Sequence, residues 1–515
     1  MGKQLRKISQ WFGSKACFVV ILMVSAISSA WIAVSSVYPM AFDEDYHLGL
    51  IKIYSHRWLP FFSSQPTNTS QYSAFTREPS YVYHYLMSFP WRIITMLTHN
   101  FMVQVITMRL LNVALFLTGL ALFRLLLLRS KFSPQVINLA LLLFILTPLT
   151  PLVAAQINYD NLLFPLLALN LILVIDFSRQ LKAREFSWTR LAIIFSLGLI
   201  TCLVKYVYLP MFIASGLYII WLLGVWARRD WPHLKQTIVA RAHNLSLKRL
   251  RLVAVVVMVV LSCGLAFERL GLNVIRYHAP QPDCSQVLTT EQCMAFGPWK
   301  RNYDIKRATQ PSADPNPFLF SYSWMRHMAF NLAFTLNGPA SDFSIGNPLP
   351  FPNWIILAFS SLGLMLIVAS LHRLLKDDVL RVCFLAMLTY LSALWLKNYS
   401  EYLELKLPTA IQGRYLLPVL IVAYLAMAVA ITNLIGNRHI IKLLSASMVI
   451  GIFLMGGGAL TFILRSDDSW YWSNKPIIST NLRVRKALQP IIPGAKPDLN
   501  NKDKPQPGCD KLTCY

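Results

Sequence analysis

Long apolar runs dominate the sequence, and they restrict its fold more than any other feature. A helix that crosses a membrane needs about 20 consecutive, mostly apolar residues. Only 14% of the 515 residues are charged, whereas soluble proteins average about 25%, so a soluble globular enzyme is excluded. The sequence predicts an all-α polytopic integral membrane protein with about eleven transmembrane helices. The eleven candidate spans are residues 16–38, 102–127, 135–155, 161–177, 190–206, 209–227, 252–272, 353–372, 380–396, 413–435 and 441–464.

Lysine and arginine residues are grouped between alternate apolar runs, as expected when the cytoplasmic loops carry the positive charge. This pattern predicts that the N-terminus lies inside and the C-terminus outside. The apolar runs would form one transmembrane domain, residues 1–465. Two large outer segments are expected at 39–100 and 273–352, followed by a short outer tail at 466–515.

The net charge of +25 raises the question of a polyanionic partner. The basic residues are dispersed in small groups without interleaved aromatic residues, so no nucleic-acid partner is predicted. Membrane lipids with anionic headgroups remain candidate partners. The sequence contains no P-loop, HExxH or GxSxG motif and no GxGxxG in a suitable context, so chemistry driven by nucleoside triphosphates has no support.

The eight cysteines are consistent with the predicted orientation. Four of them (Cys17, Cys202, Cys263 and Cys383) fall inside apolar runs, where a thiol is a small apolar side chain. The other four form two close pairs in the outer segments. Because disulfides form in oxidising compartments, the sequence predicts the disulfides Cys284–Cys293 and Cys509–Cys514.

A cluster of acidic residues follows the first apolar run directly. Asp43, Glu44 and Asp45 are consecutive, and His47 lies within one helical turn of them. Carboxylates at a membrane boundary are unfavourable unless they are hydrated or used. A carboxylate beside an imidazole can deprotonate a hydroxyl or hold a divalent cation such as Mg²⁺ or Mn²⁺. Asp43 and Glu44 are therefore candidate catalytic residues, with Asp45 and His47 as binding residues; the alternative is a hydrated acidic cap.

The same outer segment is rich in aromatic and histidine residues, among them Arg77-Glu-Pro-Ser-Tyr81 and His84. Such a composition suits stacking against a sugar, and equally an aromatic belt at the membrane surface. Arg77, Tyr81 and His84 are candidate substrate-binding residues on the first interpretation. Residues 81–98 are apolar but interrupted by polar residues and a proline, which predicts a helix at the membrane interface.

Three further polar sites lie at predicted outer ends of apolar runs. Arginine binds phosphate through two parallel hydrogen bonds, and lysine through a compact charge. Any one of these side chains alone could simply extend to the membrane surface. Together they predict a site for a lipid-linked phosphate. Its candidate residues are Asp160, Lys205, Tyr208, Gln412, Arg414 and Tyr415, whereas Arg109 and Asn112 are expected to hold helices together.

These motifs together resemble the GT-C superfamily of membrane glycosyltransferases, which includes protein O-mannosyltransferases and the lipid A aminoarabinose transferase. Asp-Glu-x-x-His at 43–47 is similar to the start of that superfamily's large outer loop, and Glu-Pro-Ser-Tyr at 78–81 to its Pro-rich step. Asn-Tyr-Asp-Asn at 158–161 resembles its junction between spans three and four. Gln-Gly-Arg-Tyr-Leu-Leu-Pro at 412–418 looks like the QGRY signature of an uncharacterised bacterial membrane-protein family placed beside it.

The resemblance covers most of residues 1–435 in topology and about twenty residues in motifs. It implies transfer of one sugar, usually with inversion, from a polyprenyl-phosphate donor to an acceptor glycan, lipid or protein. The reaction would occur on the extracytoplasmic face of the bacterial inner membrane, in synthesis of cell-envelope polysaccharide. Asp43 or Glu44 would be the general base, and Arg414 with Lys205 would bind the phosphate.

The sequence departs from the family pattern in three places. The three consecutive acids at 43–45 leave the base ambiguous, the common Pro-Pro step is Pro79-Ser80, and the tail is too short for a large carbohydrate-binding domain. Three alternatives stay open: a flippase for lipid-linked saccharides, a polymerase that joins them, and an assembly subunit without chemistry. A flippase is expected to have polar groups near the bilayer midplane and repeated halves, and neither is evident in the sequence.

Overall fold

The computed structural model describes residues 2–40, 43–247, 249–308, 315–334, 351–436, 438–456, 460, 462–463, 471–488 and 490. These residues form helices joined by loops and short turns, and the β-bridge between Ser36 and Tyr471 is the only strand-like pairing among them. The all-α prediction is therefore confirmed for this part of the chain. The predicted pair Cys509–Cys514 and most of the tail 466–515 lie outside the described residues.

The helices up to residue 277 alternate with short connections. They are α1 (Gly2–Phe12), α2 (Lys15–Ser35), α3 (Glu44–Ser55), α4 (Val82–Leu97), α5 (Phe101–Leu127), α6 (Pro134–Leu146), α7 (Leu149–Ala154), α8 (Asp160–Lys182), α9 (Trp188–Val204), α10 (Leu209–Arg229), α11 (Trp231–Leu247), α12 (Arg249–Ala266) and α13 (Leu272–Tyr277). Two short 3-10 turns, η1 (Ser70–Tyr72) and η2 (Tyr206–Tyr208), and a π-helical turn, η3 (Phe267–Gly271), complete this part.

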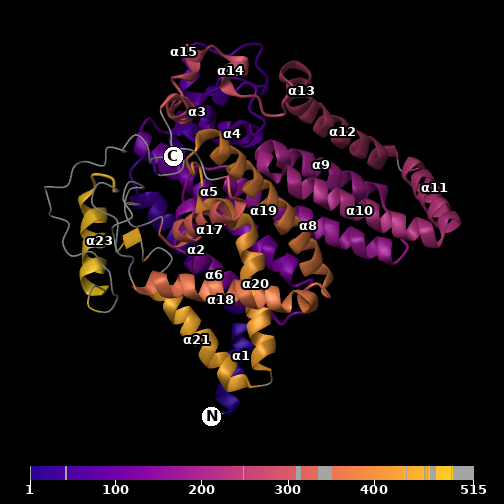
Figure 1. Cartoon of the computed structure of the whole chain (residues 1–515), viewed down its shortest axis with the longest axis vertical. Coiled ribbons are helices and arrows are strands. Elements are labelled where there is room, and N and C mark those ends of the chain that lie inside the picture. Colours follow the sequence, from indigo (N-terminus) through magenta and orange to yellow (C-terminus); the bar gives the residue numbers. More distant parts are fainter. Residues whose placement is uncertain are drawn as a thin grey trace.

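The helices after residue 277 begin with three short ones. They are α14 (Cys284–Val287), α15 (Thr290–Cys293), α16 (Gly297–Arg307), α17 (Pro317–Phe334), α18 (Phe351–Leu374), α19 (Asp378–Leu405), the 3-10 turn η5 (Gly413–Leu416), α20 (Leu417–Ile435), α21 (His439–Gly456) and α23 (Lys475–Leu488). Figure 1 shows α3, α4, α14 and α15 gathered at one end of the molecule, with α1 at the opposite end.

Seven helical segments are long and apolar enough to cross a membrane: Lys15–Ser35, Phe101–Leu127, Asp160–Lys182, Tyr206–Arg229, Arg249–Tyr277, Asp378–Leu405 and Gly413–Ile435. Four shorter apolar helices lie in the runs that supplied the remaining predicted spans: Pro134–Leu146, Trp188–Val204, Ser361–Leu374 and Ile440–Leu454. The chain is thus a helical protein suited to a membrane. The number of helices that cross and their orientation stay predictions.

The predicted span at 135–155 is not one helix. α6 ends at Leu146, Thr147 has an extended backbone with ψ 127°, and α7 begins at Leu149. Pro148 accounts for the break, because proline disfavours a helical conformation in the residue before it and has no N–H to donate. The predicted span at 252–272 is shorter than the observed helical segment, because helical backbone continues from Arg249 to Tyr277.

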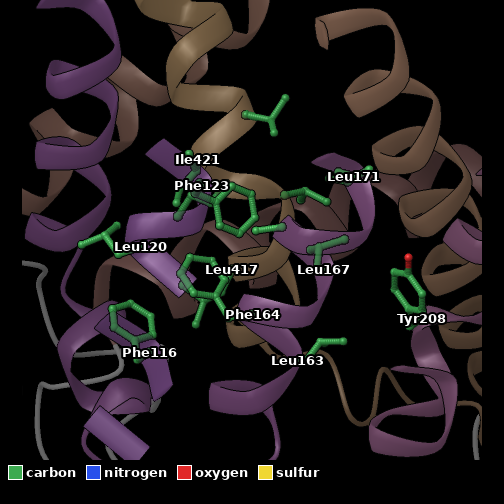
Figure 2. Packing of buried hydrophobic residues seen from close by; sticks show 14 of the residues in the cluster. Phe116, Leu120, Phe123, Leu163, Phe164, Leu167, Leu171, Tyr208, Leu417 and Ile421 are labelled. Carbon is green, nitrogen blue, oxygen red and sulfur yellow. The ribbon is translucent and has the colours of Figure 1, made fainter. Parts of the chain in front are cut away.

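The centre of the core is a stack of phenylalanine rings between α5 and α8 (Figure 2). The rings of Phe116 and Phe164 are nearly parallel, with centroids 5.0 Å apart, and Phe123 lies 4.6 Å from Phe164. Gly119 lets the two helices approach this closely, because a Cβ there would lie 2.3 Å from the Phe164 ring. This packing fixes the start of α8, which carries Asp160, relative to α5.

Candidate functional site

The acidic motif lies where the chain enters α3. Asp43 is the residue before the helix and has a left-handed backbone with φ 67°, a conformation that aspartate tolerates better than most residues. Its carbonyl oxygen accepts the N–H of His47 at 3.0 Å. Glu44 and Asp45 occupy the first turn, where the helix dipole favours acids. Asp45 is exposed, whereas Glu44 is buried.

Glu44 forms a fully buried ion pair with Arg109 of α5. Arg109 donates to both carboxylate oxygens, at 2.8 and 2.7 Å, and both side chains have no exposed surface. The remaining N–H groups of the guanidinium donate to the carbonyl oxygens of Ala33, Ser36 and Val37 at the end of α2. Arg109 therefore joins the end of α2 to the start of α3.

Two backbone groups complete the surroundings of Glu44. The N–H of Met40 donates to Oε2 at 2.7 Å, and the N–H of Ile157 donates to Oε1 at 3.3 Å. With the two bonds from Arg109, the carboxylate accepts four hydrogen bonds in a site without solvent. This environment suits a charged group that holds the fold together.

Asp43 instead pairs with Arg414 of η5, across more than 370 residues of sequence. Nη2 of Arg414 donates to Oδ2 of Asp43 at 2.7 Å. The side chain of Arg414 is 3% exposed and that of Asp43 is 41% exposed. The pair thus consists of a cation set into the protein and a carboxylate that solutes can reach.

A second ion pair lies beside the first. Nζ of Lys205, at the end of α9, donates to Asp160 at the start of α8, and both side chains are nearly buried. The same ammonium lies 4.5 Å from the ring centroid of Tyr159 and 5.3 Å from that of Tyr415. Such cation–π contacts stabilise a charge held among aromatic rings.

His47 and His84 form the third element of the site. Nδ1 of His47 and Nε2 of His84 lie 2.9 Å apart, so one nitrogen must donate and the other accept. Burial, together with nearby His84, Arg414 and Lys205, lowers the pKa of His47 well below 6.5. Burial lowers the pKa of His84 to about 3. The expected pairing of His47 with a neighbouring carboxylate is not observed among the described residues.

Tyr159 connects the histidine pair to the ion pairs. Its ring packs edge-on against His47, with centroids 4.5 Å apart, and faces the Lys205 ammonium. The ring of Tyr46 contacts both His47 and His84 from the α3 side. Two carboxylates, two cations and several rings are thus brought together from α3, α4, α8, α9 and η5.

A polar group around Asn112 of α5 supports this arrangement. Its Oδ1 accepts the hydroxyl of Tyr83 at 2.8 Å and lies 3.4 Å from the backbone N–H of Asn158 and from Nδ2 of Asn161. The segment before α8 is thereby fixed to both α4 and α5. These contacts position Tyr159 and Asp160 without adding a charge.

Arg77 and Tyr81 belong to a separate cluster that the sequence analysis missed. Arg77 pairs with Glu268 at 3.3 Å, and Arg269 lies 4.4 Å from the ring centroid of Tyr81. Arg269 is fully buried and donates to the carbonyl oxygens of Thr76 and of Pro60. A charged Glu-Arg pair inside an apolar run is the signal that could have identified this cluster.

Two other predicted binding residues lie near the ion pairs along the chain, and the backbone N–H of Tyr208 donates to the carbonyl oxygen of Lys205 at 3.0 Å. Tyr208 is buried in the core near α8 (Figure 2). Gln412 is half-buried, and its backbone carbonyl accepts the N–H of Tyr415. Among the described residues, no hydrogen bond connects either side chain to Asp43, Arg414 or Lys205.

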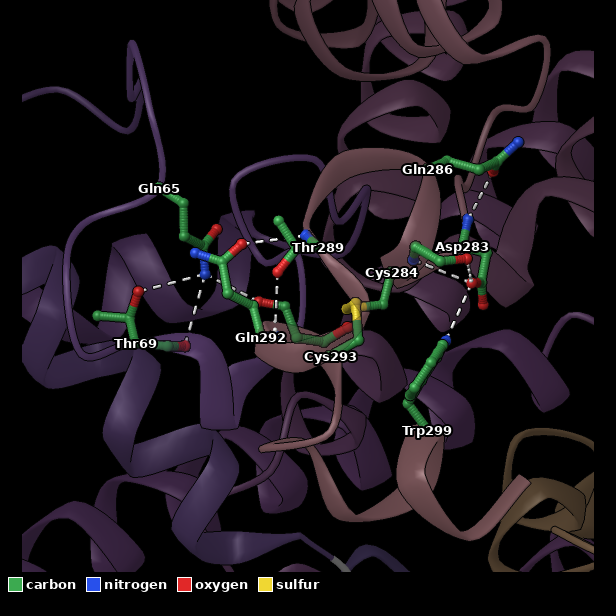
Figure 3. Close-up of a disulfide and its surroundings, with 11 residues drawn as sticks. Gln65, Thr69, Asp283, Cys284, Gln286, Thr289, Gln292, Cys293 and Trp299 are labelled. Carbon is green, nitrogen blue, oxygen red and sulfur yellow. Dashed lines mark hydrogen bonds between the residues drawn. A yellow bond between two sulfur atoms is a disulfide. The ribbon is translucent and has the colours of Figure 1, made fainter. Parts of the chain in front are cut away.

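A disulfide-linked unit after α13 packs against the segment between α3 and α4. Cys284 and Cys293 form the predicted disulfide, which joins α14 to α15 (Figure 3). Trp299 donates to Asp283, the capping residue of α14, at 3.0 Å. Phe296 then contacts the ring of Tyr46, at a centroid distance of 6.0 Å. The unit therefore reaches the border of the histidine pair.

The described residues contain no group of three or more His, Cys, Asp or Glu side chains arranged to hold a metal ion. Comparisons of the chain with protein-family models, with curated proteins and with solved structures gave no match. Functional interpretation therefore depends on the geometry of the site itself.

Proposed function

We propose that this chain is a membrane glycosyltransferase that moves a sugar from a polyprenyl-phosphate donor to an acceptor glycan, lipid or protein. The proposal depends on one observation: two ion pairs lie side by side, formed by Asp43, Arg414, Lys205 and Asp160. These residues follow or begin four different helices, and they combine a reachable carboxylate with two buried cations. A lipid-linked phosphate needs cations at the edge of an apolar bundle, and an acceptor hydroxyl needs a base.

The donor phosphate would bind at Arg414 and Lys205. Its negative charge competes with Asp43 for Arg414, and with Asp160 for Lys205, so binding releases the Asp43 carboxylate. The isoprenoid chain would lie against apolar helix surfaces in the membrane. The rings of Tyr46, Tyr159 and Tyr415 border the same space and would stack against the sugar.

The transfer step follows from this arrangement. The acceptor oxygen forms a bond to the anomeric carbon while Asp43 takes the hydroxyl proton. The bond from that carbon to the phosphate oxygen breaks, and its electron pair stays on the leaving polyprenyl phosphate. Arg414 and Lys205 stabilise the charge that develops there. Attack from the face opposite the leaving group inverts the anomeric carbon.

Asp43 is a better base than Glu44 in this proposal. Glu44 is fully buried and already accepts four hydrogen bonds, so an acceptor hydroxyl cannot reach its carboxylate. Asp43 has one cationic partner and open surface. Glu44 then serves to hold α3 in place, so that Asp43 faces Arg414.

The first test measures loss of radiolabelled sugar from polyprenyl-phosphate donors by the full chain in lipid nanodiscs. Asp43→Asn should reduce turnover by about 10²- to 10⁴-fold, the usual contribution of a general base, while donor binding persists. Asp45→Asn is the matched control, because Asp45 is an exposed neighbour, and it should retain wild-type turnover. Wild-type turnover by Asp43→Asn would contradict the assignment of the base.

Two additional arms separate the alternatives. Arg414→Gln should weaken donor binding, because the phosphate loses its most buried cation. Assays with and without EDTA test whether Mg²⁺ or Mn²⁺ takes part. Tight donor binding without turnover, whatever acceptor is supplied, would favour a flippase over a transferase. Release of oligosaccharides longer than one added sugar would favour a polymerase.

A further inference from the structure

An apolar groove of about 500 Å³ lies between α9, α11 and α12, away from the ion pairs. α9 contributes Trp188, Leu191 and Phe195, α11 contributes Ala242, and α12 contributes residues that include Leu252 and Val259. Figure 1 shows α9 and α12 alongside each other and α11 at the outer end of this group. The groove is separate from the proposed catalytic site in both position and chemistry.

The groove is lined by continuous faces of two helices. Trp188, Leu191 and Phe195 recur at intervals of three and four residues, which places them on one face of α9. Beyond the groove, α12 exposes further apolar side chains, including Val253 and Val260. A helix with apolar residues on all sides and little burial is suited to contact with lipid. The groove therefore opens toward hydrocarbon.

Positive charge is concentrated at one end of the groove. Residues 228–251 contain seven Lys and Arg residues and a single acid, Asp230. Asp230 already pairs with Arg184, at 3.3 Å. Arg241 adjoins the groove residue Ala242, and Arg249 lies one helical turn before Leu252 on the same face of α12. Both arginines are exposed, and no carboxylate pairs with either in the part of the chain that the structure describes.

The indole N–H of Trp188 fixes this end of the groove. It donates to the carbonyl oxygen of Ile238 on α11 at 3.2 Å, so the start of α9 and the basic helix α11 are held together. Tryptophan is enriched where hydrocarbon meets the polar headgroups. The apolar lining thus ends at a tryptophan that is hydrogen-bonded to the basic helix α11.

We propose that this groove is a binding site for an anionic phospholipid. One acyl chain lies in the groove, and Arg241 and Arg249 hold the headgroup phosphate at its end. A basic pocket between helices attracts acidic headgroups, because each Lys or Arg near such a surface adds to the attraction. A lipid without net charge would make the same apolar contacts, but the two arginines would attract its headgroup less strongly.

The test counts lipids retained by the purified full chain in native mass spectrometry. The probes are 1-palmitoyl-2-oleoyl phosphatidylglycerol and the phosphatidylcholine with the same chains. Wild-type protein should retain one phosphatidylglycerol and at least ten-fold less phosphatidylcholine. Ala192→Trp, which fills the groove, and the double change Arg241→Gln/Arg249→Gln should each lose most of the retained phosphatidylglycerol.

The matched control is Arg373→Gln/Lys376→Gln. It removes the same charge from two exposed residues, one in the last turn of α18 and one just after that helix, and should retain phosphatidylglycerol as wild type does. Ala242→Trp fills the groove from α11 if Ala192→Trp does not fold. Equal retention of the two lipids, or undiminished retention by folded groove variants, would overturn the proposal. A dimer that dissociates in these variants would overturn it too, because a second copy would then cover the face.

Discussion

Neighbouring carboxylates at residues 43 and 44 have opposite surroundings, and this difference defines the candidate site. Glu44 is enclosed and accepts bonds from a guanidinium and two backbone N–H groups. Asp43 is at the surface of the bundle with Arg414 behind it. Two adjacent residues thus have different roles: the Glu44 carboxylate stabilises the fold, and a substrate can reach the Asp43 carboxylate. The backbone at Asp43, in the left-handed region, directs the two side chains apart.

Removing one partner of the buried pair should destabilise the protein strongly. Glu44→Gln leaves the charge of Arg109 without a counter-ion in a site without solvent, a change that costs about 3–5 kcal/mol for buried pairs. Asp43→Asn should change the free energy of unfolding by about 1 kcal/mol or less, because that carboxylate is partly exposed. Unfolding titrations in mixed micelles measure both values. Equal stability of the two variants would contradict the structural role of Glu44.

The histidine pair should make stability depend on pH. His47 and His84 lie on α3 and α4, outside the helices that can cross a membrane. Burial lowers the pKa of both in the folded protein, that of His84 to about 3. The unfolded chain therefore binds more protons as the pH falls below about 6.5, and each histidine removes up to about 1.4 kcal/mol of stability per pH unit. Above that pH their contribution is constant.

Thermal unfolding between pH 7 and pH 5 checks this expectation. The double variant His47→Asn/His84→Gln should lose less stability on acidification than the wild type does. His56→Gln, which changes an exposed histidine at the end of α3, is the control and should follow the wild type. An unchanged acid sensitivity in the double variant would show that other groups cause it.

At the scale of elements, apolar patterning located the long apolar helices but not their internal breaks. The break after Leu146 had a visible signal in Pro148, whose effect on the preceding residue is local. The π-helical turn η3 had no comparable signal. The adjacent Glu268 and Arg269 indicate a charged cluster in this apolar run but not the helical geometry there; in the structure Glu268 pairs with both Arg269 and Arg77. The pairing of Glu268 with Arg77 becomes visible only when segments far apart in the sequence are placed in space.

The same distinction applies to the site. The alternation of spans predicted that residues 43, 160, 205 and 414 share one side of the bundle, and the structure brings them into contact. Which acid faces which base depends on the rotation and packing of each helix. Sequence spacing does not determine these, so the Asp43–Arg414 and Asp160–Lys205 pairs could not be assigned in advance.

The close approach of α5 and α8 gives a prediction at this scale. Gly119→Ala places a methyl group 2.3 Å from the Phe164 ring, which neighbouring phenylalanines hold in place. Overpacking of this kind costs roughly 1–3 kcal/mol. Gly216→Ala on α10 is the control, because no atom lies within 4 Å of its added Cβ. It should be neutral or stabilising, since alanine favours a helix.

The measurement is the free energy of unfolding of both alanine variants in the same micelles. A tolerated Gly119→Ala would mean that the phenylalanine stack between α5 and α8 adjusts easily. The position of Asp160 relative to Asn112 would then be less constrained than the packing indicates, and turnover of the Gly119→Ala variant would remain near that of the wild type.

For the whole molecule, the arrangement of helix ends favours one orientation for the site. α3 begins, α8 begins, α9 ends and α20 begins close to the Asp43–Arg414 and Lys205–Asp160 pairs. The same end carries the disulfide-linked α14 and α15 (Figure 1). A disulfide belongs in an oxidising compartment. The site and the disulfide should therefore face the outside together, opposite the basic loops.

Labelling of introduced cysteines in intact cells tests this orientation. Ser64→Cys lies in the exposed loop between α3 and α4, and Ser133→Cys lies in the exposed connection between α5 and α6, beside Arg129 and Lys131. A maleimide that does not cross membranes should label Ser64→Cys directly and Ser133→Cys only after permeabilisation, because positively charged loops stay inside. The wild-type chain, labelled in parallel, gives the background from its own cysteines. Direct labelling of Ser133→Cys with protection of Ser64→Cys would invert the topology and place the two ion pairs on the cytoplasmic side, where a transferase that works on the outer face could not use them.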